Sequence, residues 1–503
     1  GLLAGSTTLG TGQRLGAFEV FDNDGPWDRS DDYRRHNGVL RFSQGDRLNG
    51  FNLTAMGYGG DWNATDQIPR RAVDSGLIGR FGALDTSDGG ETYRLSLSGE
   101  WRRSDQDYAT HLHGYFIDYA LNLFSNFTFF LDDPVNGDQF EQEDDRQVYG
   151  VHAHHTWFGS WGGLEMENTV GFQLRYDDIG SVGLFKTRER QRLATIRQDS
   201  VDQVSVSPYL RNRTQWLPKF RTVAGLRGDV YHFDVDSSNP ANSGTEIDGL
   251  ASPKLSLIFG PWFGTEYYIN LGFGFHSNDG RGTTATVDPK TREPVEKVDP
   301  LVRAKGFDVG LRTGVIPEFQ STLSFWLLDL DSELLFIGDA GTTEASRPSR
   351  RFGVEWTNYY KPWPWLIVDA DFSFSKARFK DDDSLGDHIP GAIETVIAAG
   401  ATVDDIKGWF GGIRVRYFGS RPLIEDNTVR SDPTLLVNAG IGYKLGKRWR
   451  TGLEVLNLLD AEDSDIEYFY PSRLPGEPLE GVEDIHFHPV EPLSVRLSLT
   501  AYF

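Results

Sequence analysis

The sequence contains no cysteine and only two methionines in 503 residues. Disulfide bonds and thiolate metal sites are therefore impossible, which suits an envelope protein in oxidising surroundings. Long apolar runs are also missing: none approaches about 18 residues, so a membrane-spanning helix is excluded. A membrane β-barrel is not excluded, because its strands alternate apolar and polar residues and leave no such run.

Basic residues are scarce as well. Fifty Lys and Arg stand against 73 Asp and Glu, a formal net charge of −23. A nucleic-acid partner would need a basic face, so this charge argues against one, and we predict no nucleic-acid partner. Aromatic residues, in contrast, make up 13% of the chain, and glycine occurs 56 times. Tyr, Trp and Phe favour strands and membrane interfaces. No linker or composition break divides the chain, which predicts one domain over residues 1–503.

Alternation of apolar and polar residues predicts strands along the whole chain. The last eleven residues read LSVRLSLTAYF, and residues 146–157, 409–417 and 435–445 show the same period of two. This period is typical of a strand with one apolar and one polar face. Each stretch has about ten residues or more, enough to cross a bilayer when tilted.

The predicted connections fall into two kinds that alternate. The ten longer polar connections include residues 61–90, 177–200, 277–299 and 461–489. The ten short ones lie around residues 10–13, 44–46, 104–107, 159–162, 217–219, 260–264, 316–318, 361–364, 403–405 and 445–447. This pattern predicts an all-β fold, a large antiparallel transmembrane β-barrel of the outer membrane, with short periplasmic turns and long outside loops.

Twenty connections predict twenty-one strands. In hydrocarbon an unpaired strand edge is costly, so the sheet must close with its last strand beside its first. Single-chain bacterial barrels usually have an even number of strands. We therefore expect one further strand, and whatever precedes it, outside this chain.

Several stretches resemble the barrel of TonB-dependent outer-membrane receptors. They are ASPKLSLIFGPWFGTEYYINLGFGFHSNDGRG (residues 251–282), LDLDSELLFIGDAGTTEASRPSRRFGVE (328–355), LEVLNLLDAEDSDIEYFY (453–470) and the C-terminal aromatic strand. The resemblance covers essentially the whole chain. It implies a 22-stranded barrel. It also implies an N-terminal plug and a short segment that engages TonB, and neither the plug nor this segment is part of this sequence.

Four histidines are candidate ligand-binding residues. His152 and His154 share the polar face of one predicted strand, and His111 and His113 lie two apart on the preceding strand, on a face that the sequence leaves open. Imidazoles paired on neighbouring strands suit a transition metal or a metal chelate, and ordinary polar lining is the alternative. Arg414 and Arg416 are predicted to face the lumen and contact a plug.

The leading hypothesis is an outer-membrane receptor and transporter for TonB-coupled uptake of a scarce small ligand, such as a metal chelate, vitamin or sugar. The alternatives are a passive pore or structural barrel without a plug and, more weakly, a barrel-embedded hydrolase. We predict no enzyme and no cofactor, because no nucleophile–base arrangement or cofactor motif stands out. The expected partners are outer-membrane lipid, the TonB system through a plug, and the small ligand.

Overall fold

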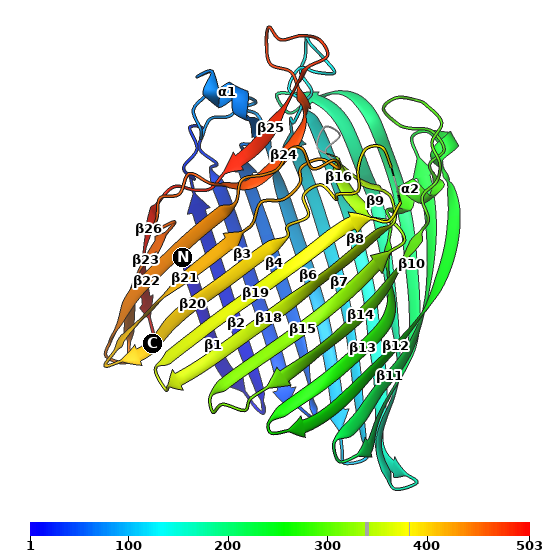
Figure 1. The fold of residues 1–503 in the computed structure, drawn as a ribbon, viewed down its shortest axis with the longest axis vertical. Helices are drawn as coiled ribbons and strands as arrows, with labels where there is room; N and C mark the ends of the chain where they lie inside the picture. The colour runs from blue at the N-terminus through cyan, green and yellow to red at the C-terminus, as the bar shows by residue number, and fades with distance from the viewer. Residues whose placement is uncertain (338–341, 382) are drawn as a thin grey trace.

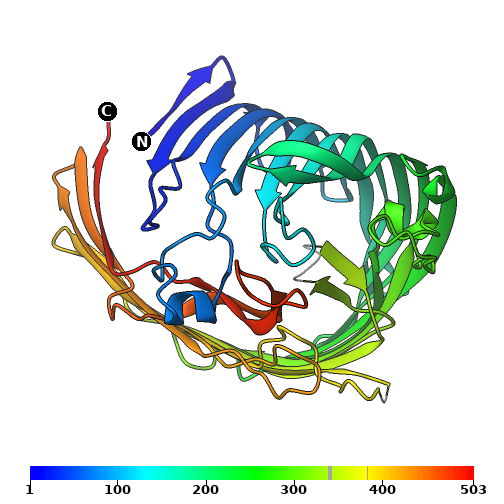
Figure 2. The ribbon, with the colours of Figure 1, turned by 90° about the horizontal axis from the view of Figure 1, so that it is seen from above.

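The computed structural model describes residues 1–337, 342–381 and 383–503. In these residues, 21 strands form one antiparallel sheet that curls into a ring, which confirms the predicted fold class (Figures 1 and 2). No helix of the described residues combines the length and the apolar character needed to cross a membrane. The strands of the sheet are β1 (Leu2–Leu9), β2 (Gly12–Asn23), β3 (Tyr33–Gly45), β4 (Gly50–Asn63), β6 (Gly89–Ser104), β7 (Tyr108–Ser125), β8 (Phe140–Trp161), β9 (Leu164–Arg188), β10 (Gln191–Leu217), β11 (Phe220–Ser237), β12 (Gly244–Trp262), β13 (Thr265–Ser277), β14 (Leu301–Thr313), β15 (Phe319–Leu330), β18 (Ser349–Trp363), β19 (Leu366–Phe379), β20 (Thr395–Ile406), β21 (Trp409–Phe418), β22 (Thr434–Leu445), β23 (Trp449–Leu456) and β26 (Ser494–Ala501).

Short turns join the strands at one end of the ring, at or within a few residues of all ten predicted positions. Gly162 and Gly163 form the turn between β8 and β9 with φ of 60° and 81°, a conformation that glycine adopts without steric cost. Exposed tryptophans, among them Trp161, Trp262 and Trp363, gather at these turns. Such a belt of indoles is typical of a membrane–water interface.

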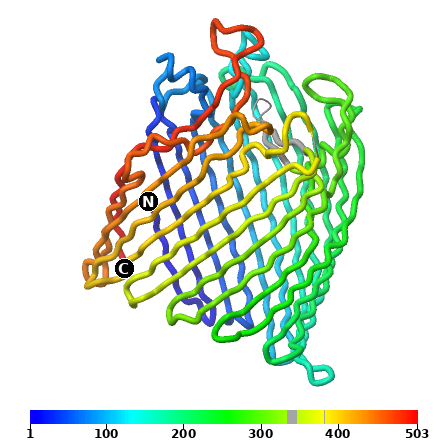
Figure 3. The backbone as a smooth tube through the Cα atoms, in the orientation of Figure 1, coloured from blue at the N-terminus to red at the C-terminus, as the bar shows by residue number. Residues whose placement is uncertain are grey.

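The longer connections lie at the opposite end and carry the remaining elements. These are β5 (Ile68–Pro69), α1 (Arg70–Asp74), η1 (Pro240–Asn242), α2 (Gly280–Thr284), β16 (Leu334–Ile337), β17 (Thr342–Ala345), β24 (Ser464–Ser472) and β25 (Val482–Pro489). Figure 3 shows how these segments rise above the strands or fold back over the ring. Of the stretch 328–355 that resembles the receptor family, residues 338–341 lie outside the described residues.

The prediction of a long loop over residues 177–200 is wrong. β9 and β10 continue through this segment as a paired hairpin, and only Glu189 and Arg190 form its turn. Both have positive φ, 51° and 62°, as a two-residue turn of the twisted hairpin type requires. The segment is polar because the hairpin extends past the apolar part of the barrel, so its composition imitates a loop.

The two faces of the sheet differ as the alternation predicted. On β6 and β7 the outward side chains Leu95, Leu97 and Leu112 are large, apolar and about half exposed. The inward side chains between them include Glu100 and His111, which are hydrogen-bonded to each other. An exposed apolar band around a polar lumen is the pattern of a membrane barrel.

The ring has a seam between its terminal strands. β1 pairs with β2 and β26 pairs with β23, and among the described residues no pairing joins β1 to β26. Figure 2 shows the two strands as neighbours around the ring with an interval between them, as the sequence predicted. Each seam strand thus presents one unpaired edge. The further strand expected between them stays a prediction.

Candidate functional site

The strand register places all four candidate histidines on the inner face. His111 lies opposite His154, and His113 lies opposite His152, across the β7–β8 pair. Directly paired residues project to the same side of a sheet. The alternating position Leu112 is on the outward face and exposed. The structure therefore settles the face of His111 and His113, which the sequence left open.

Three of the four rings form a compact group. One ring nitrogen from each of His111, His152 and His154 lies within 4.8 Å of those of the other two. The ring centroids are 5.0 Å apart between His111 and His154, 5.3 Å between His152 and His154, and 5.9 Å between His111 and His152. His113 is not part of this group, although it is on the same face.

Neighbouring strands hold two of these rings in place. The Nε2 atom of His111 is hydrogen-bonded to Glu100 on β6, whose carboxylate also accepts from Asn52 on β4 at 2.7 Å. The Nε2 atom of His152 is 2.9 Å from the hydroxyl of Tyr209 on β10. Sequence inspection missed Glu100 and Tyr209, because only the barrel register brings them beside the histidines.

The predicted arginines occupy the opposite part of the ring. Arg414 on β21 makes two 3.0 Å hydrogen bonds to the carboxylate of Asp369 on β19. A carboxylate of the barrel wall thus already neutralises much of the positive charge of Arg414. Arg416 is exposed and has no ion pair with any residue in the described part of the chain. The predicted contact of these two side chains with a plug stays a prediction.

A further set of inward charges was not predicted. Arg175 donates to Asp177 at 2.6 and 2.7 Å, and Arg227 donates to Asp229 at 2.7 Å. In each pair the partners are two residues apart on one strand, so the period of two puts them on the same face. Both aspartates are almost fully buried. At these two positions the inner wall therefore carries neutralised ion pairs.

Loops from both sides of the seam meet over the mouth of the barrel, and we call residues 64–88, 126–139 and 461–489 the loop clasp. β5 pairs with β25, which itself pairs with β24 (Figure 2). Ala72, Phe129 and Leu474, one from each of the three segments, form a buried apolar cluster. Since β4 and β23 lie on opposite sides of the seam, the clasp bridges it at this end.

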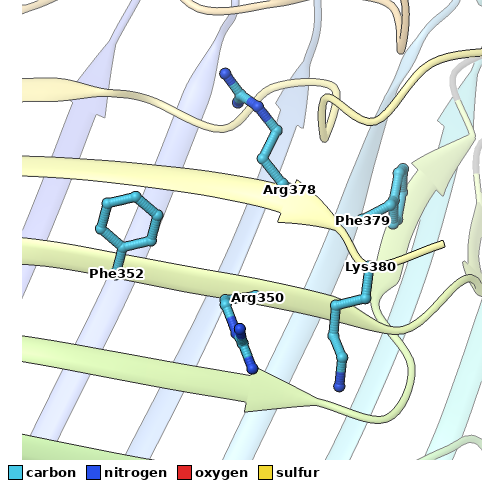
Figure 4. A pocket seen from close by; sticks show the side chains of 5 residues that line it. All are labelled: Arg350, Phe352, Arg378, Phe379 and Lys380. Atoms are coloured by element: carbon cyan, nitrogen blue, oxygen red, sulfur yellow. The ribbon is translucent and has the colours of Figure 1, made fainter. Parts of the chain in front are cut away.

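The outer ends of β18 and β19 carry a hollow of about 320 Å³, shown in Figure 4. Arg350, Phe352, Arg378, Phe379 and Lys380 line it. Arg350 donates to Asp329 at 2.7 and 2.8 Å, and the Lys380 ammonium is 3.7 Å from the same carboxylate. The Arg378 guanidinium is 3.7 Å from Asp387, so all three basic groups face a carboxylate of the protein itself, which leaves little free charge for a ligand.

Comparisons with known proteins agree with this architecture. The model of the TonB dependent receptor-like β-barrel family matches residues 20–458. No curated protein sequence matches the chain significantly. The closed form of the ferric-catecholate import receptor Fiu of E. coli K12 is similar in structure, with a TM-score of 0.78 and 14% identity, over 100% of this chain and 79% of that one.

Two other solved structures are similar. The unliganded ferric citrate transporter FecA has a TM-score of 0.77 at 12% identity, over 99% of this chain and 74% of that one. The copper transporter OprC has a TM-score of 0.70 at 15% identity, over 99% of this chain and 79% of that one. Identities this low show a common fold alone. Together with the match of the family model over most of the sequence, they lead to one assignment: the chain belongs to the TonB-dependent receptor β-barrel family.

Proposed function

We propose that the chain is the barrel of an outer-membrane receptor that takes up a scarce small ligand, such as a metal chelate, in a process coupled to TonB. The observation that carries the proposal is the family match over residues 20–458. The exposed apolar band and the tryptophans at the short turns support a position in a bilayer. With this position, the short turns face the periplasm and the loop clasp faces the outside.

The shape of the molecule supports capture rather than free diffusion. A barrel of about 22 strands is too wide for its own side chains to fill. The loop clasp lies over the mouth of this barrel, where it would meet a ligand first. The structural neighbours include a ferric-catecholate import receptor, a ferric citrate transporter and a copper transporter. These names make metal chelates the first ligands to test, before vitamins and sugars.

Coupling to TonB requires a plug in the lumen. This chain spans about three quarters of the chains of Fiu and FecA. We propose that a plug lies in the lumen of this barrel, and that an additional strand pairs with the free edges of β1 and β26. Pairing of both edges is expected because bilayer hydrocarbon offers no water to an open edge.

Uptake in cells tests the proposal. Cells that produce the complete gene product should accumulate radioactive iron supplied as ferric catecholate or ferric citrate, and the same cells without TonB should not. Accumulation that persists without TonB, together with steady conductance of the purified protein in planar bilayers, would instead establish the passive pore. If no metal chelate is taken up but a vitamin or sugar is, in a TonB-dependent way, the protein is still a TonB-coupled receptor and its ligand is of another class.

A further inference from the structure

Some ring nitrogens of the three clustered histidines have hydrogen-bond partners and others have none. His111 and His152 each engage a neighbour through Nε2. The Nδ1 atoms of His111 and His154 are buried and have no hydrogen-bond partner among the described residues. A buried polar atom left without a partner costs roughly 1–3 kcal/mol. Ordinary polar lining does not explain why two such atoms occur in one group of three rings.

The contacts of His111 and His152 suit metal ligands. A histidine that binds a metal generally uses its other ring nitrogen to donate to a carboxylate or another oxygen, which orients the ring and raises its basicity. Glu100 is placed to accept such a bond from His111, and the Tyr209 hydroxyl contacts His152. Glu100 is itself held in place by hydrogen bonds from Asn52 and from the Arg102 guanidinium, so its position beside His111 is fixed.

The types of atom decide the class of ion. Imidazole nitrogens suit zinc, copper and nickel, whereas calcium and magnesium prefer oxygen ligands. Three protein ligands with a further position open are typical of sites that also bind water or an exogenous group. The inner face of the barrel would leave that further position directed to the lumen.

We propose that His111, His152 and His154 form a binding site for a divalent transition-metal ion in the barrel wall, with one nitrogen from each ring as a ligand. The site lies on β7 and β8 near the end with the short turns. This inference goes beyond the proposed function and does not rest on it, because the ion would bind whether or not TonB-coupled uptake occurs.

Copper titration of the complete gene product, purified in detergent without an affinity tag, tests the site. We expect one saturable Cu²⁺ site whose electron paramagnetic resonance spectrum shows coupling to about three imidazole nitrogens, and competition by Zn²⁺. Single replacements His111→Ala and His154→Ala should each weaken binding more than about tenfold and remove one nitrogen from the spectrum.

Two further variants sharpen the test. His113→Ala is the matched control, since His113 is on the same face and outside the group, and binding should be unchanged. Glu100→Gln should weaken binding about tenfold or more without changing the number of nitrogens, because it alters only the support of His111. Circular dichroism and gel mobility before and after heating report whether each barrel is folded, and His111→Gln replaces the alanine variant if that one is not.

Several results would overturn the inference. One is the lack of a saturable copper site in the folded chain. Others are binding that survives both His111→Ala and His154→Ala, or binding that falls as far with His113→Ala as with His111→Ala. None of these results concerns uptake in cells, so the metal site and the proposed function can fail separately.

Discussion

The backbone amide of Arg71 donates to the Oδ2 atom of Asp484 at 2.9 Å, although 413 residues separate them in the chain. The guanidinium of Arg71 continues the contact with two hydrogen bonds to Glu477, at 2.8 and 2.9 Å, and with bonds to the carbonyl and hydroxyl of Ser472. One arginine of residues 64–88 thus binds three residues of the last long loop, 461–489. This arrangement makes the loop clasp sensitive to single substitutions.

Replacing Arg71 by alanine should loosen the loop clasp while the barrel stays folded. The partners Glu477 and Asp484 are only about one-fifth exposed, so losing the charged hydrogen bonds should destabilise the clasp by about 2 kcal/mol. Thermolysin should then cleave residues 461–489 faster than in the wild type. The control is Arg496→Ala, whose ion pair with Glu454 is more than half exposed and contributes little. Equal cleavage of both variants would contradict the role of Arg71.

Acid should weaken the same clasp through His486. This ring is fully buried, stacks on Tyr470 at 3.8 Å and contacts the Ser472 hydroxyl at 2.7 Å. Burial, and secondarily the charge of Arg71, lowers the pKa of His486 to about 3. Because the folded clasp binds this proton less readily than the unfolded one, the stabilisation is present above pH ~6.5 and is lost as the pH falls toward 3.

Hydrogen exchange of the β25 amides measures this effect. After correction for intrinsic exchange rates, the protection of these amides against exchange should be lower at pH 5 than at pH 7.5 in the wild type. In His486→Phe, which keeps a ring against Tyr470 but cannot take up a proton, this difference should shrink. An unchanged difference in the variant would assign the pH dependence to other groups.

Much of the barrel could be predicted from sequence, because the period of two and the turn residues are local signals. The short turns and the two faces follow from them. The sequence of the outer part of the β9–β10 hairpin resembles that of a loop, because its charged residues, such as Arg188 and Arg192, lie past the apolar band. No local pattern predicts the pairing of β5 with β25, since only the curling of the whole sheet brings them together. The histidine group could be predicted in part. The two pairs of histidines are visible in the sequence, but the strand register that places His111 opposite His154 is not.

The two faces of β6 should respond differently to a new charge. Leu97 is directed outward and is 46% exposed, and its neighbour Ser98 is directed into the lumen. An arginine at position 97 should destabilise the barrel by about 2–4 kcal/mol if the site is near the bilayer midplane, because the guanidinium would enter hydrocarbon. Ser98→Arg should destabilise the barrel much less, since its side chain enters the aqueous lumen. Urea titration in phospholipid vesicles, followed by tryptophan fluorescence, compares them, and equal losses would mean that the faces are misassigned.

The orientation in the membrane can be read with single cysteines, because the chain has none of its own. Leu479 in the loop clasp is 67% exposed and Phe263 in a short turn is 92% exposed, so local burial protects neither position. A maleimide that cannot cross membranes should therefore label Leu479→Cys on intact cells but not Phe263→Cys, because only the first faces outside. After the outer membrane is permeabilised, both should react, which controls for folding and expression. Labelling of position 263 but not 479 on intact cells would reverse the topology and place the short turns outside.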